Sequence, residues 1–290
     1  MRLVVLGSGG RVGAAMARIY AKEAEVIAFN RRELDLASES ALEVTLGGLD
    51  FDVLVNCAAA TSPDYCETHE AEAFAVNARA VRTIAEICSR KRARCIHLST
   101  DYVFDGTQSC DYAETAAAEP INVYGRSKRQ GELELLSVSE DFLAVRVSWV
   151  FGPDRPGFVE QLLMRAMDGN GPLAAVGDKW SVPTSVFDII SELRPFLREN
   201  PIGGVLHLTQ SGGACTWQEY GRYALDCAAR AGVPLKLHEV GRQTLDEMAV
   251  FVAKRPVYTA MATERLTAVS GRPPRPWQEA LEEYVRAYYA

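Results

Sequence analysis

Residues 2–23 read RLVVLGSGGRVGAAMARIYAKE, and this stretch decides the fold that the sequence predicts. A short apolar run leads into a loop in which Gly7, Gly10 and Gly13 stand three apart, and a helical pattern follows the loop. Glycines in such a loop allow a tight turn and a close approach of the backbone to a ligand, while the helix N-terminus offers free N–H groups to an anion. The stretch predicts a cradle for phosphate groups, typical of dinucleotide binding; an ordinary turn is the alternative.

The alternation of strand and helix continues through the first half of the chain. The predicted strands are nearly apolar and span residues 3–6, 26–29, 53–55, 96–98 and 142–147. The helical patterns between them span residues 11–23, 38–47, 70–91 and 122–138. Strands without polar alternation, separated by helices, indicate a parallel sheet covered on both faces. With right-handed crossovers, residues 1–150 are predicted to form a doubly wound α/β domain that binds a dinucleotide.

The second half of the chain has a different rhythm, because glycine and proline become denser in it. Its helical patterns span residues 158–168, 185–199, 216–231 and 276–288. No linker separates the halves, which predicts that residues 151–290 form a smaller α/β substrate domain packed against the first. Residues 184–210, with a strand near 205–208, are expected to fold back and complete the first sheet.

The composition excludes several classes of protein. The 290 residues carry 31 Lys and Arg against 38 Asp and Glu, and this net charge of −7 argues against nucleic-acid binding. No apolar run approaches the ~18 residues that a membrane span needs. The seven cysteines form no CxxC pair, which is typical of a protein of the reducing cytoplasm. The four histidines are scattered along the chain, so no metal site is expected.

The end of the second predicted strand bears on the choice of cofactor. It reads Asn30-Arg31-Arg32, where a site selective for NAD usually carries an acidic residue that accepts from the ribose 2′-hydroxyl. Arginine suits a 2′-phosphate instead, so the sequence favours NADPH, with NADH left open. Two solvated loop arginines are the alternative. Further predicted cofactor contacts are Arg11, Val12, Asp35 and Leu36.

A candidate catalytic pair follows the fourth predicted strand. Tyr124 and Lys128 are four residues apart and lie on one face of the predicted helix, and the strand before it ends in Ser99-Thr100. In open α/β sheets, ligands bind beyond the carboxyl ends of the strands. A phenol with an ordinary pKa of ~10 exchanges protons poorly at neutral pH, and a neighbouring ammonium lowers that pKa. Thr100 would then hold the substrate oxygen while Tyr124 transfers a proton.

With these motifs, the sequence resembles the extended short-chain dehydrogenases/reductases, and among them most closely the dTDP-4-dehydrorhamnose reductase family. The resemblance covers essentially the whole chain. Its most specific part is the block STDYVFDG at 99–106 followed by NVYGRSK at 122–128. The other matching segments are the glycine loop, VNCAA at 55–59, RVSWVFG at 146–152, PTS at 183–185 and KRP at 254–256.

The resemblance implies a role for each matching residue. The implied catalytic residues are Thr100, Tyr124 and Lys128, of which Lys128 would also bind the nicotinamide ribose. The implied substrate contacts are Asp101, Tyr102, Trp149 and Arg255. The implied cofactor contacts are Asn56, Cys57, Ala58 and Ala59, with Asn77 bracing the strand below the site. The residues alone leave structural alternatives open: a loop cap for Asp101, packing for Tyr102, ordinary core for Trp149 and a satisfied buried histidine for His97.

The implied activity is the reduction of a nucleotide-activated 4-keto-6-deoxysugar by NADPH, with hydride transfer to C4. One alternative is an epimerase or dehydratase of the same superfamily. Another is a non-catalytic subunit that binds a dinucleotide and regulates a partner enzyme, as the β subunit of methionine adenosyltransferase does. The chain departs from many relatives at Arg11, at 180–182 and at 257–259, which bears on the substrate more than on the chemistry. A homodimer is left open.

Overall fold

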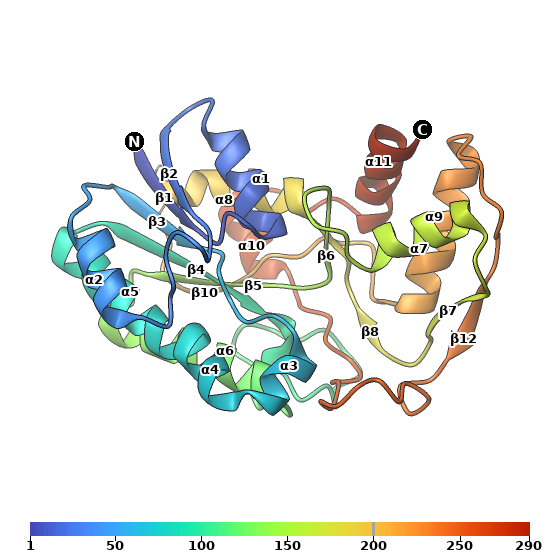
Figure 1. Cartoon of the computed structure of the whole chain (residues 1–290), viewed down its shortest axis with the longest axis horizontal. Coiled ribbons are helices and arrows are strands. Elements are labelled where there is room, and N and C mark those ends of the chain that lie inside the picture. Colours follow the sequence, from blue (N-terminus) through green and yellow to red (C-terminus); the bar gives the residue numbers. More distant parts are fainter. Residues whose placement is uncertain (199–200) are drawn as a thin grey trace.

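The computed structural model describes residues 1–198 and 201–290, and its centre is a six-stranded parallel sheet (Figure 1). The strands lie in the order β10-β5-β4-β3-β1-β2. Their bounds are β1 Arg2–Leu6, β2 Glu25–Phe29, β3 Val53–Asn56, β4 Arg94–Thr100, β5 Leu143–Val147 and β10 Gly204–His207. The chain runs from β1 outward to β2 and then returns to the other side of β1 for β3, so the winding direction changes between β1 and β3. The predicted doubly wound α/β fold is confirmed.

Helices cover both faces of this sheet, which explains why its strands carry little polar alternation (Figure 1). In β1, Leu3 and Val5 pack toward one face while Val4 and Leu6 pack toward the other, and all four are buried. The helices of the first face are α1 Arg11–Tyr20, α8 Val186–Leu197 and α10 Glu264–Ser270. Those of the second face are α2 Glu39–Gly47, α5 Ala80–Lys91 and α6 Val123–Val138.

The rest of the second half builds a separate apolar core from three helices and short strands. The helices are α7 Phe158–Asp168, α9 Trp217–Arg230 and α11 Trp277–Tyr289. The strand pairs are β7 Leu173–Val176 with β12 Val240–Gln243, β8 Trp180–Ser181 with β11 Cys215–Thr216, and β6 Val150–Phe151 with β9 Thr184–Ser185. In the parts of the chain that the structure describes, no helix is both long and apolar enough to cross a bilayer.

Several elements differ from the sequence-based expectation. The predicted helix 70–91 is α4 Glu70–Phe74, a π-helical turn η1 Ala75–Arg79, and then α5. A short helix α3, Pro63–Thr68, was not predicted, although Ser62 caps it by accepting from the Tyr65 N–H. The pattern at 185–199 is helical from Val186 to Leu197, and residue 199 lies outside the described residues. The π-helical turn and α3 are too short to produce a hydrophobic periodicity from which they could be predicted.

Candidate active site

A cavity of about 920 Å³ opens beyond the carboxyl ends of the central strands. It lies where the winding direction of the sheet changes, which is the usual ligand crevice of doubly wound folds. Most of the predicted site residues line it: Gly7, Gly10, Arg11, Val12, Asn30, Arg31, Asp35, Leu36, Cys57, Ala58, Ala59, Thr100, Asp101, Tyr102, Tyr124, Lys128 and Trp149. Five predicted residues do not: Gly13, Arg32, Asn56, Asn77 and Arg255.

The glycine loop has the geometry of a phosphate cradle. Gly7 has a φ of +84°, and a β-carbon there would stand 2.7 Å from the backbone nitrogen of Ala58. A β-carbon on Gly13 would overlap the Gly7 carbonyl oxygen, so this glycine allows α1 to pack on the loop. Gly10 is the N-cap of α1 and offers no side-chain cap to the first N–H groups of the helix. These N–H groups and the positive end of the helix dipole are available to a ligand anion.

The two arginines after β2 differ in their surroundings. Arg31 lines the cavity and forms an ion pair of 3.0 Å with Glu72 at the start of α4. The other carboxylate oxygen of Glu72 accepts from the Tyr65 hydroxyl at 2.6 Å. Arg32 lies outside the cavity lining, and its backbone N–H donates to the Asn30 side chain at 2.9 Å. Of the two arginines, only Arg31 therefore lies at the cavity.

Arg11 spans the two halves of the chain. Its Nε donates to the Arg155 carbonyl oxygen at 2.9 Å, and a second nitrogen donates to the carbonyl of Val150. Its guanidinium also lies 3.9 Å from the carboxylate of Glu160 in α7. The guanidinium is thus occupied by contacts with residues 150–160, although Arg11 still lines the cavity.

Tyr124 and Lys128 are held in the first turns of α6. Asn122 caps the helix by accepting from the Gly125 N–H at 2.8 Å, and its amide donates at 2.8 Å to the Lys254 carbonyl. Burial raises the pKa of Tyr124 above its ordinary value, and a hydrogen bond with Thr100 offsets only part of the rise. The expected lowering of this pKa by a neighbouring ammonium is therefore wrong for the protein without ligands, because burial outweighs it. Burial lowers the pKa of Lys128 to about 7. Its Nζ donates to the Leu98 carbonyl oxygen at 2.6 Å.

Thr100 and Asp101 end β4 and begin a 3-10 turn, η2 Asp101–Val103. The Thr100 hydroxyl donates to one oxygen of the Asp101 carboxylate at 3.1 Å. The other oxygen accepts from Ser181 at 3.1 Å and from Thr259 at 2.5 Å. Burial raises the pKa of Asp101, and the buried ammonium of Lys179 opposes that shift. Ser181 and Thr259, from the second half of the chain, therefore hold the carboxylate that accepts from Thr100.

Tyr102, Tyr124 and Trp149 form the aromatic part of the site. The rings of Tyr102 and Tyr124 meet edge to face at 5.6 Å. Trp149 has a φ of +38°, a strained value for a residue with a side chain, and such strain is typical of ligand sites. Within the described structure, its buried Nε1 has no hydrogen-bond partner. An orphaned donor in a cavity wall suits a polar ligand atom.

Arg255 and Asn77 serve contacts outside the cavity. The Arg255 guanidinium forms a bidentate ion pair with Asp64 of α3, at 3.0 and 2.5 Å, and stacks on Phe251. Asn77 accepts from the Ala60 N–H at 2.8 Å and donates to the Ala60 carbonyl at 3.0 Å. Arg255 thereby joins the two halves, and Asn77 fixes the loop after β3.

Some residues around the site carried no sequence signal. Lys179, Ser181 and Thr259 surround Asp101, yet they lie about 80 to 160 residues away from it in the chain. Glu72 was hidden in a helical pattern rich in acidic residues. The Trp180-Ser181-Val182 departure from relatives was a pointer to this region, although it did not reveal the partner carboxylate.

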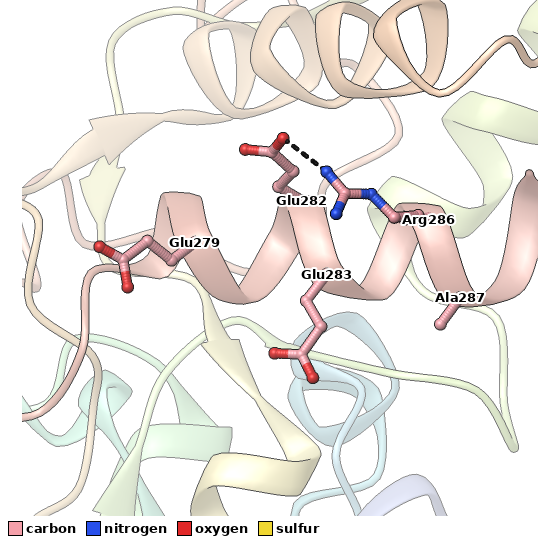
Figure 2. A pocket seen from close by; sticks show the side chains of 5 residues that line it. All are labelled: Glu279, Glu282, Glu283, Arg286 and Ala287. Carbon is pink, nitrogen blue, oxygen red and sulfur yellow. Dashed lines mark hydrogen bonds and ion pairs between the residues drawn. The ribbon is translucent and has the colours of Figure 1, made fainter.

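A second hollow, of about 360 Å³, lies on α11 and is shown in Figure 2. Its lining residues are Glu279, Glu282, Glu283, Arg286 and Ala287. None of these is a predicted site residue. Among residues 1–198 and 201–290, no three His, Cys, Asp or Glu side chains lie close enough together to hold a metal ion.

Comparisons with known proteins agree with this geometry. The family model described as RmlD substrate binding domain matches residues 1–290. The dTDP-4-dehydrorhamnose reductase of Aggregatibacter actinomycetemcomitans is 32% identical over 295 residues, which cover 99% of each chain. A probable dTDP-4,6-dihydroxy-2-methyloxan-3-one 4-ketoreductase of Streptomyces antibioticus is 33% identical over 287 residues, covering 98% of this chain and 94% of the relative.

A solved structure leads to the same family. The crystal structure of dTDP-4-dehydrorhamnose reductase from Bacillus anthracis in complex with NADP superposes with a TM-score of 0.90 at 25% identity, covering 98% of each chain. The chain therefore belongs to the RmlD substrate-binding domain family, the dTDP-4-dehydrorhamnose reductase family that its motifs predict.

Proposed function

We propose that this protein reduces the C4 carbonyl of a nucleotide-activated 4-keto-6-deoxysugar, with NADPH as the preferred hydride donor. The observation that carries the proposal is that Thr100, Tyr124 and Lys128 line the same cavity as the glycine loop. The names of the relatives support a dTDP-linked 4-keto sugar as the substrate class. The sequence departures around 180–182 and 257–259 leave the particular sugar to experiment.

The cavity fits a dinucleotide by its own chemistry. The free N–H groups of α1 and the left-handed Gly7 suit a diphosphate, and Arg31 suits the charge of a 2′-phosphate. A reduced nicotinamide bound there supplies the hydride. The protein's part is to exclude water, to orient the carbonyl group and to deliver a proton to its oxygen.

Tyr124 is the proton donor in this proposal. Burial keeps its pKa above the ordinary value, so the phenol holds its proton at neutral pH until charge develops on the carbonyl oxygen. As negative charge develops on the carbonyl oxygen, the phenol proton moves to that oxygen and Tyr124 becomes a phenolate. Thr100, whose hydroxyl donates to Asp101 in the structure, turns that hydrogen to the carbonyl oxygen and holds this oxygen beside the phenol. The orphaned Nε1 of Trp149 is suited to a sugar or phosphate oxygen.

The test is NADPH oxidation with a panel of nucleotide-linked 4-keto sugars, beginning with dTDP-4-keto-6-deoxyhexoses. Wild-type protein is expected to turn over at least one of them. Tyr124→Phe is expected to lose about 10²–10⁴-fold in kcat while it keeps NADPH affinity, because only the transferred proton is removed. Tyr223→Phe on α9, outside the cavity lining, is the matched control and keeps full activity. A wild-type protein that binds NADPH, reduces no 4-keto sugar nucleotide and captures a partner enzyme would overturn the proposal in favour of a regulatory subunit.

A further inference from the structure

A buried histidine, His97, lies directly beneath Lys128. It belongs to β4, three residues before Thr100, and its side chain has no solvent exposure. Its Nδ1 lies 3.1 Å from the amide nitrogen of Asn56 at the end of β3. Its Nε2 lies 2.9 Å from the Nζ of Lys128. The imidazole therefore bridges the sheet and the catalytic lysine.

The backbone decides which nitrogen of His97 carries the proton. The side-chain oxygen of Asn56 accepts from the Ala58 N–H at 3.0 Å, and a backbone N–H can only donate. This contact turns the amide group of Asn56 so that its NH₂ points at His97, where it donates to Nδ1. Burial and the neighbouring Lys128 lower the pKa of His97 well below its ordinary value, so the ring is neutral. A neutral ring that accepts at Nδ1 carries its proton on Nε2.

The Nε2–H then meets Lys128 across 2.9 Å. An amine has a lone pair that accepts this hydrogen, and it still donates to the Leu98 carbonyl. An ammonium has no lone pair, so the same contact would set two donors against each other. Turning Asn56 to relieve this clash would place its NH₂ against the Ala58 N–H instead. The series of hydrogen bonds that runs from Ala58 through Asn56 to His97 thus favours the amine form of Lys128. The amine form makes one buried hydrogen bond that the ammonium form cannot make.

We propose that His97 is a positioning residue for Lys128: its Nε2–H, fixed by Asn56, stabilises the amine that Lys128 becomes when it returns a proton to Tyr124. This inference rests on the proposed function, in which Tyr124 gives its proton to the carbonyl oxygen. The Lys128 ammonium then loses one proton, which reaches the Tyr124 phenolate through water or a ligand hydroxyl in the cavity that both residues line, and solvent later restores the ammonium. An amine and an ammonium of similar stability near neutral pH exchange protons most effectively there.

The other ionisable groups around Lys128 do not take over this role. Glu132, on α6, favours the ammonium through its charge. Cys57, after β3, keeps its proton near neutral pH because burial raises its pKa to about 12, so it adds no charge there. Glu132 is already bound to Arg146 at 2.7 Å and to Ser99 at 2.6 Å. Tyr124, on the same helix, has its proton at neutral pH. His97 is the group in direct contact with the Lys128 nitrogen, so its tautomer decides what that nitrogen meets.

The first experiment reads the tautomer in the full-length protein without ligands. Nitrogen-15 NMR of the imidazole rings, with the His97 signals identified from their loss in His97→Met, reports which nitrogen carries hydrogen. We expect an Nε2–H tautomer that persists from pH 6 to pH 8. A ring protonated at Nδ1, or one that takes a second proton within this range, would overturn the proposal. The tautomer is read from the wild-type protein, so the conclusion does not depend on the folding of His97→Met. If that variant folds poorly, selective labelling of histidine identifies the His97 signals.

The second experiment reverses the tautomer without changing the packing. In Asn56→Asp, the carboxylate still accepts from the Ala58 N–H but also accepts from His97, which moves the ring proton to Nδ1 and leaves Nε2 to accept from an ammonium. The Lys128 titration, followed by NMR of its side-chain amine, should rise by about one pH unit or more. The same substitution in a His97→Met background should lose most of that shift. A shift of equal size in both backgrounds would mean that the charge of Asp acts directly, and it would overturn the relay.

Activity separates this inference from the proposed function. If the protein reduces a 4-keto sugar nucleotide, Asn56→Asp should extend the high-pH limb of kcat by the same amount as the Lys128 titration, with little change in KM. If His97 had a purely structural role, Asn56→Asp would lower kcat equally at every pH. That result would count against the inference. If the tautomer and titration are as expected but no 4-keto sugar turns over, the proposed function fails while the Asn56–His97–Lys128 relay stands.

Discussion

The Nη2 atom of Arg11 lies 2.5 Å from the point where a β-carbon at residue 157 would stand, so Gly157 makes room for the Arg11 guanidinium. The same guanidinium is bonded to the carbonyl of Arg155 just before it. Through this contact α1 is attached to the loop that leads into α7. Arg11 and Gly157 are 146 positions apart in the sequence.

Gly157→Ala is therefore expected to destabilise the protein. The backbone at Gly157 is extended, with φ −110° and ψ −152°, so alanine brings no backbone strain and the effect reports the lost space. Displacing the buried part of Arg11 should lower the free energy of unfolding by about 1–3 kcal/mol in urea titrations. In an Arg11→Gln background the same substitution should cost clearly less. Gly47→Ala, with open space around it, is the control and should cost nothing.

The two arginines after β2 should differ in their effect on NADPH. Arg31→Ala should raise the Kd of NADPH by about tenfold to a hundredfold and change that of NADH little, because a charge-assisted hydrogen bond to the 2′-phosphate is lost. Arg32→Ala, its neighbour outside the cavity lining, should change neither constant much. Fluorescence titration with each cofactor measures this. Equal losses for NADPH and NADH would show that Arg31 does not recognise the 2′-phosphate.

Glu72 should act in the opposite direction. Its carboxylate neutralises Arg31 in the ion pair of 3.0 Å and would lie near a 2′-phosphate. Glu72→Gln removes that competing charge and keeps the shape of the side chain, so NADPH affinity should rise a few-fold at low salt. NADH affinity should stay the same or fall. The ratio of the two Kd values is the readout, and an unchanged ratio would contradict the expectation.

Lys179 should be needed for stability because of the buried carboxylate beside it. Its ammonium is buried, donates to the Pro256 carbonyl at 2.8 Å and opposes the raised pKa of Asp101. Lys179→Met leaves that carboxylate without its counter-charge and should cost about 3–5 kcal/mol in urea unfolding. Adding Asp101→Asn should recover part of this loss, since the uncompensated charge is then absent. No recovery in the double variant would mean that Lys179 acts through packing alone.

Stability should fall as the pH drops below the ordinary histidine range. Burial, followed by the nearby Arg146, lowers the pKa of His207 to about 3, whereas an unfolded histidine has a pKa of about 6.5. Below about pH 6.5 the unfolded chain binds a proton at this histidine that the folded protein does not bind. Lowering the pH from 7 to 5 should therefore reduce the free energy of unfolding by about 2 kcal/mol for each such histidine. His207→Gln should therefore show a shallower pH dependence than wild type by about that amount. Urea titrations at the two pH values measure the difference.

Local patterns were sufficient to predict the central architecture and to bring Thr100, Tyr124 and Lys128 to one cavity. The glycine loop, the apolar strands and the spacing of Tyr124 and Lys128 are properties of neighbouring residues, and backbone geometry converts such spacing directly into position. The predicted placement of Thr100 at a strand end followed from the same rule. For these elements the sequence was enough, because hydrogen bonding and helix or strand periodicity act over a few residues.

The partners of the charged side chains depended on the folded chain. Arg11 was predicted to contact the cofactor and Arg255 the substrate, and in the structure their guanidinium groups contact the Arg155 carbonyl and Asp64, which are distant in sequence. A long, flexible side chain reaches any partner within several ångströms, so its contacts follow from how the two halves pack. The hydrogen-bonded surroundings of Lys128 arise in the same way. Sequence alone thus specified the sheet, the glycine loop and the cavity-lining positions of Thr100, Tyr124 and Lys128, while packing between distant segments set the charge and hydrogen bonding around them.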